Sequence, residues 1–191
     1  MEERTKLAIF DLDGTLFDTK DVNYRAYCSA LTECGFICNI DYEFYCHFCN
    51  GNNYKVFLPR IVPGISVADM QRVHSVKMRA YKSYLDQAVK NEHLFSMIKL
   101  IRSSYQIALV TTASRDNTND ILERFEVKDE FDFILTKEDV EHTKPAPDAF
   151  LKAMEIAGVI QDQTIIFEDS ETGIEAAEAS GAKYMVVHGY N

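Results

Sequence analysis

The chain has 191 residues and is 47% hydrophobic, a composition that excludes an intrinsically disordered protein. It contains eight Gly and four Pro, too few for a collagenous protein or a Pro-rich linker. With 30 acidic against 20 basic residues, its net charge of -10 would repel duplex nucleic acid and anionic membranes, so neither is expected as a main partner.

The N-terminal region begins with a short apolar run, Leu7–Phe10, which ends at a carboxylate. This run is too short for a signal peptide or a transmembrane helix. The five cysteines are an odd number, which favours free thiols over a disulfide framework. We therefore expect a cytoplasmic protein, and we expect it to be a monomer or a weak dimer.

Residues 18–90 contain no strand-like runs, and their apolar residues recur at helical intervals. This pattern predicts a helical domain inserted directly after a first strand at residues 7–10. The segment Leu58–Arg60, which contains Pro59, is expected to separate two of the helices.

From residue 91 onward, short apolar runs bounded by turn residues alternate with amphipathic stretches. Such runs predict buried parallel strands, and the alternation predicts βαβ crossovers. The expected strands are 107–110, 131–135, 165–167 and 184–187. With the first strand, the sequence predicts an α/β fold: residues 1–17 and 91–191 form a doubly wound, parallel, five-stranded Rossmann-like sheet, and residues 18–90 form an inserted all-helical cap domain.

Carboxylates follow two of the expected strands. Asp11 and Asp13 stand at the end of the first strand, and Gly14 lets the chain turn so that both can face one pocket. Glu168 and Asp169 follow the strand at 165–167. An acidic turn would explain the first pair alone, but four acids at adjoining strand ends would repel one another by several kcal/mol unless a cation joined them. A hard divalent ion such as Mg²⁺ is therefore expected.

Hydroxyl and ammonium groups complete this set. Thr111 and Thr112 follow the strand at 107–110, and Lys144 lies in a Lys-Pro-Ala-Pro segment. Taken singly, such a Thr more often caps a helix and such a Lys is more often a surface charge. Around paired carboxylates and a metal, however, they are typical of a site that holds a phosphoryl group.

The order of these motifs resembles that of the haloacid dehalogenase superfamily. The motifs are D-x-D-G-T-L-x-D at 11–18, a strand plus Thr111, Lys144 before Pro-x-Pro, and a strand plus Glu168-Asp169. The resemblance is closest to the branch of phosphatases and β-phosphoglucomutases that carry an all-helical cap. It covers roughly residues 5–18 and 95–188.

The resemblance implies a mechanism. Asp11 would be the nucleophile that forms an aspartyl-phosphate, and Asp13 would protonate the leaving alcohol and then deprotonate the attacking water. Lys144 would also screen the charge of Asp11. An ionised carboxylate can attack an anionic phosphorus only if the phosphoryl charge is neutralised, which Mg²⁺ and Lys144 can do. The surrounding negative field would favour the protonated form of Asp13.

The resemblance also assigns binding residues. The metal ligands would be Asp11, Asp13 through its backbone carbonyl, Glu168 directly or through a water, and Asp169. The phosphoryl oxygens would be held by Thr111, Thr112 and Lys144. In the cap, the candidate substrate contacts are Asn23, Asn52, Lys55 and Lys77. For Lys77 the competing interpretation is a lysine on a helix surface.

The predicted function is that of a phosphoric monoester hydrolase, a Mg²⁺-dependent phosphatase acting on a small phosphorylated metabolite. One alternative is a phosphomutase of the β-phosphoglucomutase type. It is disfavoured because that subgroup carries a cap His where this chain has Asn23, and a cap Arg that is absent from the segment 51–54. The other alternative is a non-catalytic metal-binding or interaction module on the same fold, against which the intact motifs argue.

Overall fold

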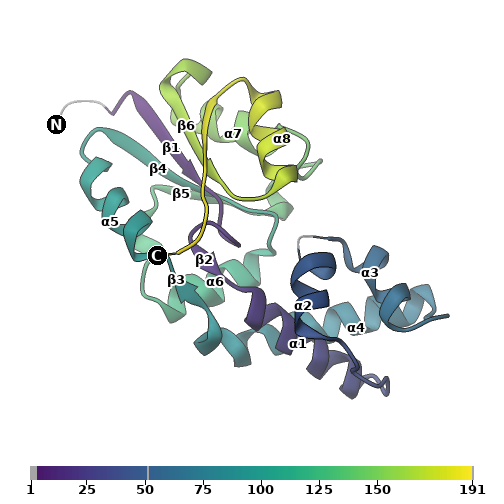
Figure 1. Ribbon diagram of the computed structural model, residues 1–191. Coiled ribbons are helices and arrows are strands. Elements are labelled where there is room, and N and C mark those ends of the chain that lie inside the picture. The colour runs from purple at the N-terminus through teal and green to yellow at the C-terminus, as the bar shows by residue number, and fades with distance from the viewer. Residues whose placement is uncertain (1–3, 51, 191) are drawn as a thin grey trace. The chain divides into compact units, whose positions relative to one another are not determined.

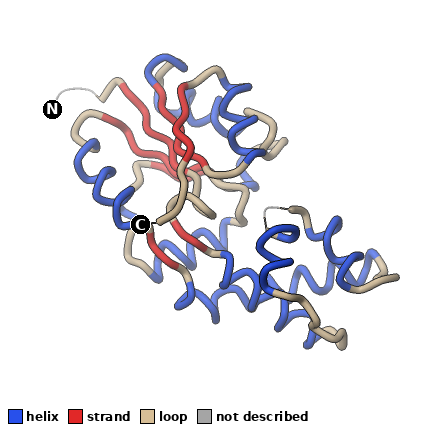
Figure 2. The backbone as a smooth tube through the Cα atoms, in the orientation of Figure 1, coloured by secondary structure: helices blue, strands red, loops and turns tan. Residues whose placement is uncertain are grey.

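The computed structural model describes residues 4–50 and 52–190. The chain divides into two compact units (Figures 1 and 2). Met1–Asp18 and Val89–Asn191 form one unit, here called the core, and Thr19–Ala88 form the other, here called the cap.

The core is built on one five-stranded sheet in which every neighbouring pair of strands is parallel. The order of the strands is β5-β4-β1-β6-β7. Their bounds are Lys6–Phe10 for β1, Tyr105–Val110 for β4, Phe133–Leu135 for β5, Thr164–Glu168 for β6 and Lys183–Val186 for β7. Each of the five expected apolar runs supplies one strand, so the predicted fold class is confirmed.

The central strand β1 is covered on both faces, which explains its uninterrupted apolar sequence. All four residues from Leu7 to Phe10 are fully buried. Leu7 and Ile9 belong to an apolar cluster with residues of the helices α7 (Asp148–Ala157) and α8 (Glu171–Ser180). Figure 1 shows these two helices on one side of the sheet and α5 (Glu92–Ile101) on the other.

The remaining helix of the core, α6 (Arg115–Arg124), follows β4 and begins at Ser114, whose hydroxyl accepts a hydrogen bond from Asn117 N. Short 3-10 helices occupy three of the connections. Their bounds are Lys128–Glu130, Lys137–Asp139 and Gln161–Gln163.

The chain leaves and re-enters the core through two short antiparallel strands, β2 (Phe17–Asp18) and β3 (Val89–Lys90). Asn91 fixes the return point, because its backbone N–H donates to Leu16 O at 2.9 Å. Its side chain is buried, and its Oδ1 accepts a hydrogen bond from Leu94 N at the start of α5. The exit and the return are therefore held together within the core.

The cap is entirely helical in its described residues. Its elements are α1 (Lys20–Glu33), α2 (Tyr42–Phe44), a π-helical turn (Tyr45–Cys49), α3 (Tyr54–Ile61), α4 (Val67–Ala80) and a 3-10 helix (Tyr81–Gln87). Its small core is rich in aromatic side chains: the Tyr27 ring meets the Phe57 ring edge-on at 5.0 Å and lies 6.4 Å from the Tyr45 ring. Within residues 4–50 and 52–190, every helix is too short or too polar to span a bilayer.

The expectation that Pro59 separates two helices is wrong. Pro59 lies inside α3, where a proline costs about 3 kcal/mol because it lacks an N–H and crowds the preceding turn. The two residues before it, Phe57 and Leu58, are 1% and 0% exposed in the cap core. Full burial of two such side chains contributes about 3–6 kcal/mol, which is enough to offset the proline.

The two faces of α5 give a direct test of the packing. Ile98 is fully buried, whereas Leu100, two residues later, is 80% exposed. We expect Ile98→Ala to lower the free energy of unfolding by about 2–5 kcal/mol, because it removes buried methyl groups and leaves a cavity. Leu100→Ala should change it by less than about 0.5 kcal/mol. Urea titrations of both variants followed by circular dichroism measure the difference, and equal losses would contradict this packing.

Candidate active site

Three neighbouring strands, β4, β1 and β6, end side by side at one edge of the sheet. Phe10 lies opposite both Leu109 and Phe167 in the strand register. The polar residues that follow these positions are therefore brought to the same edge, where ligands of doubly wound folds bind. They are Asp11 after β1, Thr111 after β4, and Glu168 and Asp169 at the end of β6.

Lys144 reaches this edge from the loop before α7. Its ammonium lies 2.6 Å from Asp11 Oδ1 and 2.5 Å from Glu168 Oε1, and it also donates to Val110 O at 3.1 Å. The side chain of Lys144 is only 4% exposed. Burial opposes the charged form of Lys144, but the two carboxylates outweigh this effect and raise its pKa, so the ammonium stays charged.

Glu168 is fully buried, and both of its oxygens are used within the protein. Oε1 accepts from Lys144, while Oε2 accepts from Asp169 N at 2.9 Å and from Ser170 N and Ser170 Oγ, each at 3.0 Å. Gly173 in α8 makes room for this carboxylate, because a Cβ there would lie 1.9 Å from the carboxyl carbon. The structure thus fixes Glu168 as the anchor of Lys144.

Asp169 is fixed from the first strand-end loop. Thr15 Oγ1 donates to Asp169 Oδ1 at 3.0 Å. Gly14 has a φ of +96°, and a Cβ on it would lie 1.9 Å from Asp169 Oδ2, so only glycine fits beside this carboxylate. Burial, with the nearby charge of Glu168, raises the pKa of Asp169 to about 6.

The site contains more negative than positive charge. Asp11, Glu168 and Asp169 each offer an oxygen within 4.8 Å of one another. Burial raises the pKa of Asp11 well above its usual range; the Lys144 ammonium opposes this, and the charges of Glu168 and Asp169 add to it. The Lys144 ammonium contacts two of these three carboxylates, Asp11 and Glu168. Oxygen donors with this excess charge suit a hard divalent cation.

The other predicted core residues also lie at this edge. Asp13 is half-buried in the loop after β1, where it bridges to Phe17. Thr111 is buried, and its hydroxyl oxygen accepts from Ala113 N at 3.0 Å, which leaves the hydroxyl proton to be donated. Thr112, in contrast, is exposed.

The two candidate asparagines of the cap form hydrogen bonds with residues four positions earlier in the chain. Asn23 Nδ2 donates to Thr19 O and Oγ1, both at 3.1 Å. Asn52 is exposed, and its Nδ2 donates to Phe48 O at 2.8 Å. These contacts account for both side chains locally, and a contact with substrate stays a prediction.

The two candidate lysines of the cap differ in burial. Lys55 is exposed and lies 6.0 Å from the Tyr54 ring. Lys77 is only 7% exposed, with its ammonium 5.3 Å from the Tyr27 ring and 5.0 Å from the Tyr81 ring. The alternative of a surface lysine is therefore wrong for Lys77, because aromatic faces can hold an ammonium out of water.

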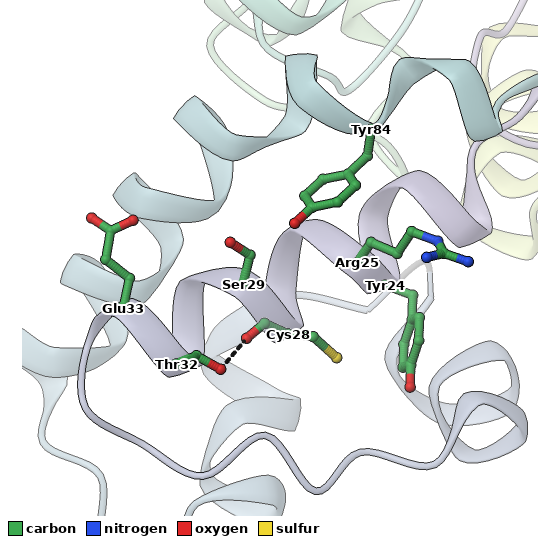
Figure 3. A pocket seen from close by; sticks show the side chains of 7 residues that line it. All are labelled: Tyr24, Arg25, Cys28, Ser29, Thr32, Glu33 and Tyr84. Atoms are coloured by element: carbon green, nitrogen blue, oxygen red, sulfur yellow. Dashed lines mark hydrogen bonds between the residues drawn. The ribbon is translucent and has the colours of Figure 1, made fainter.

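A surface hollow of about 580 Å³ lies within the cap (Figure 3). It holds none of the predicted site residues. Its lining residues are Tyr24, Arg25, Cys28, Ser29, Thr32, Glu33 and Tyr84. Burial and the neighbouring Cys38 raise the pKa of the Cys28 thiol to about 12, so this hollow offers no reactive thiolate.

Sequence reasoning missed the residues that orient the carboxylates. Thr15 binds Asp169, Ser170 binds Glu168, and Gly173 makes space for Glu168. Two of these residues could have been found from their position beside the acidic residues. Thr15 is inside the acidic motif at 11–18, and Ser170 directly follows Asp169. Gly173 gives no such signal, because a glycine early in a helix has many explanations.

Comparison with known proteins decides the family. A model of the haloacid dehalogenase-like hydrolase family matches residues 8–187. The chain belongs to this family.

Two phosphatases are similar to this hydrolase along most of their length. A phosphorylated carbohydrates phosphatase from Thermotoga maritima is 27% identical, over 96% of this chain and 86% of the relative. A fructose-1-phosphate phosphatase from Escherichia coli is 28% identical, over 95% of both chains. The prediction of a phosphatase of this family is thereby confirmed. Among solved structures, CbbY from Rhodobacter sphaeroides in complex with phosphate has the same fold, with a TM-score of 0.83 and 22% identity, over 97% of this chain and 87% of that one.

The space at Gly173 gives a test of the Glu168 anchor. In an ordinary helix interior, Gly→Ala stabilises by about 1 kcal/mol. In this hydrolase we expect Gly173→Ala to destabilise instead, because the new methyl group would displace the Glu168 carboxylate and leave the Lys144 ammonium with one fewer partner. The free energy of unfolding in urea measures the sign, and a stabilised variant would contradict the described packing.

Proposed function

We propose that this hydrolase is a Mg²⁺-dependent phosphatase that cleaves a small phosphomonoester through a phosphorylated Asp11. The observation that carries the proposal is the buried Lys144 ammonium between Asp11 and Glu168, with Asp169 close by. A cytoplasmic location is part of the proposal and agrees with five cysteines that are all free thiols, as is typical of a reducing compartment.

The nucleophile in this proposal is Asp11. One of its carboxylate oxygens would attack the phosphorus while the bond from phosphorus to the alcohol oxygen breaks. The positive charge of Lys144, which is paired with Asp11, would offset the negative charge of the Asp11 carboxylate. An anionic phosphoryl group could then approach this buried carboxylate. The buried Thr111 hydroxyl would donate to a phosphoryl oxygen, and Thr112, at the exposed edge, would act beside it.

Asp13 would act as the general acid and base. It would give a proton to the departing alcohol oxygen, and it would later take a proton from the water that attacks the phosphorus. That second step breaks the bond between phosphorus and Asp11 and returns both aspartates to their starting state. Two residues of one loop thus share the chemistry, Asp11 by covalent attachment and Asp13 by proton transfer.

The metal would be held by Asp11, Asp169 and the backbone carbonyl of Asp13. When bound, a divalent ion would neutralise charge on the phosphoryl oxygens and on the carboxylates. Glu168 would contact it only through a water, because both of its oxygens already accept hydrogen bonds from Lys144, Asp169 N and Ser170. Its main part would be to hold Lys144 against Asp11.

The names of two relatives support a proposal for the substrate class. Two of them are named for phosphorylated carbohydrates and for fructose 1-phosphate. A small phosphorylated carbohydrate is therefore the substrate class that we propose for this chain. The cap candidates Asn23, Asn52, Lys55 and Lys77 remain proposed contacts for the alcohol part of the substrate.

Removal of the nucleophile tests the proposal directly. We expect Asp11→Asn to lower Mg²⁺-dependent phosphate release by about a thousandfold or more, because an amide cannot attack phosphorus. Asp162→Asn, at an exposed position of the Gln161–Gln163 helix, is the matched control and should keep full activity. The measurement is release of inorganic phosphate from a panel of sugar phosphates.

The same panel distinguishes the alternatives. A phosphomutase would move phosphate to another carbon of the substrate without release into solution. A non-catalytic module would release none from any ester. Unchanged turnover in Asp11→Asn would exclude the aspartyl-phosphate route.

The raised pKa of Asp169 predicts how metal binding depends on pH. Its pKa of about 6 in the metal-free protein, caused first by burial and then by Glu168, means that a proton competes with the ion below that pH. Isothermal titration calorimetry should give a Mg²⁺ dissociation constant that rises by at least about tenfold for each pH unit below about 6, since the pKa of Asp11, a second proposed ligand, is raised as well. A constant value across this range would contradict a ligand role for Asp169.

A further inference from the structure

The last described segment of the chain runs past the active site. After β7, Val187 N donates to Glu168 O at 2.8 Å, so residues 187–190 start beside the end of β6. Gly189, with a φ of +79°, turns the chain immediately before Tyr190. Figure 1 shows this segment, in yellow, running from β7 toward the short strands β2 and β3.

The hydroxyl of Tyr190 is buried there without a hydrogen-bond partner among the residues that the structure describes. Burial raises the pKa of this phenol, and four aspartates add to the effect, so the phenol stays protonated. The four carboxylates are those of Asp18, Asp169, Asp13 and Asp11, in decreasing order of effect. The buried hydroxyl therefore lies within the electrostatic influence of these carboxylates, and no residue that the structure describes forms a hydrogen bond with it.

An unused buried hydroxyl costs free energy unless a ligand completes its hydrogen bonds. Its environment selects that ligand. Of the four carboxylates that act on Tyr190, Asp18 has the largest effect, and the other three, Asp169, Asp13 and Asp11, are the proposed holders of the metal. Mg²⁺ keeps several of its water molecules when it binds to proteins, and such waters need acceptors and donors around them.

We propose that Tyr190 is a positioning residue of the metal site, whose hydroxyl binds a water molecule of the hydrated divalent cation. This inference rests on the proposed function, since it needs the ion at Asp11 and Asp169. Without the metal, no residue in 4–50 or 52–190 forms a hydrogen bond with the hydroxyl, and a bound ion would supply a partner through its water.

A single deletion of the hydroxyl tests the inference. Tyr190→Phe keeps the ring and removes only the oxygen. The matched control is Tyr184→Phe, in β7, where the lost hydroxyl donates to Glu178 Oε1 at 2.7 Å on the surface. Calorimetric titration of each metal-free protein with Mg²⁺ alone gives the dissociation constants, and urea unfolding without metal gives the stabilities.

We expect Tyr190→Phe to weaken Mg²⁺ binding by about tenfold or more, the usual effect of removing a group that supports a metal ligand. Its metal-free stability should be equal to or above that of the wild type, because an unbonded hydroxyl has been removed. Tyr184→Phe should bind Mg²⁺ like the wild type. A purely structural role of Tyr190 would give the reverse, with lower metal-free stability and unchanged affinity.

The outcomes separate the two proposals. If the wild type binds no Mg²⁺, the proposed metal-dependent function fails. If the wild type binds Mg²⁺ and Tyr190→Phe binds it equally well, only the inference about Tyr190 fails. A raised KM for a sugar phosphate with unchanged Mg²⁺ affinity would show that the hydroxyl meets the substrate, which also overturns it. Failure of Tyr190→Phe to fold would contradict the unbonded hydroxyl on which the inference depends.

Discussion

The balance between carboxylate and ammonium charge at one edge of the sheet is the constraint on which the candidate active site depends. Three carboxylates, from Asp11, Glu168 and Asp169, lie close together in a largely buried site, and the Lys144 ammonium contacts two of them, Asp11 and Glu168. The imbalance is visible in the raised pKa of Asp11, where burial and like charges outweigh the attraction of Lys144. A site with this excess of negative charge suits a divalent cation, and under the proposed function a bound cation would let the site accept an anionic phosphoryl group.

The fold supplies this imbalance by geometry. Parallel strands end in register, so β1 and β6 deliver their carboxylates to one place, and the glycines there let side chains come closer than a Cβ would allow. Gly14 yields space to Asp169, and Gly173 yields space to Glu168. The cost of crowding the acids is met by fixed donors, above all Lys144 and the backbone N–H groups after Glu168.

Local patterns made most of the core predictable. Runs of apolar residues marked all five strands, and in the central strand β1 burial on both faces requires an apolar residue at every position. The expectation of a buried strand is wrong for β7, which lies at the edge of the sheet and is exposed along its length. The carboxylates of the candidate site were also predictable, since Asp11 and Glu168-Asp169 stand directly at strand ends. Hydrogen bonds between distant residues could not be predicted in this way. Thr15 and Asp169 are 154 positions apart, and the pairing of strands in the sheet brings them together. In the cap, two expectations from the local sequence were wrong because tertiary packing outweighed local preference. Pro59 lies inside α3, and Lys77 is buried.

The central claim is that a neutralised site allows Asp11 to become phosphorylated. The most direct measurement is mass spectrometry of protein that is quenched with acid during turnover of a sugar phosphate, with and without Mg²⁺. The account predicts one added phosphoryl group, located on the peptide that contains Asp11 and formed only when Mg²⁺ is present. A phosphoryl group on another residue, or full turnover with no phosphorylated Asp11 trapped, would contradict it.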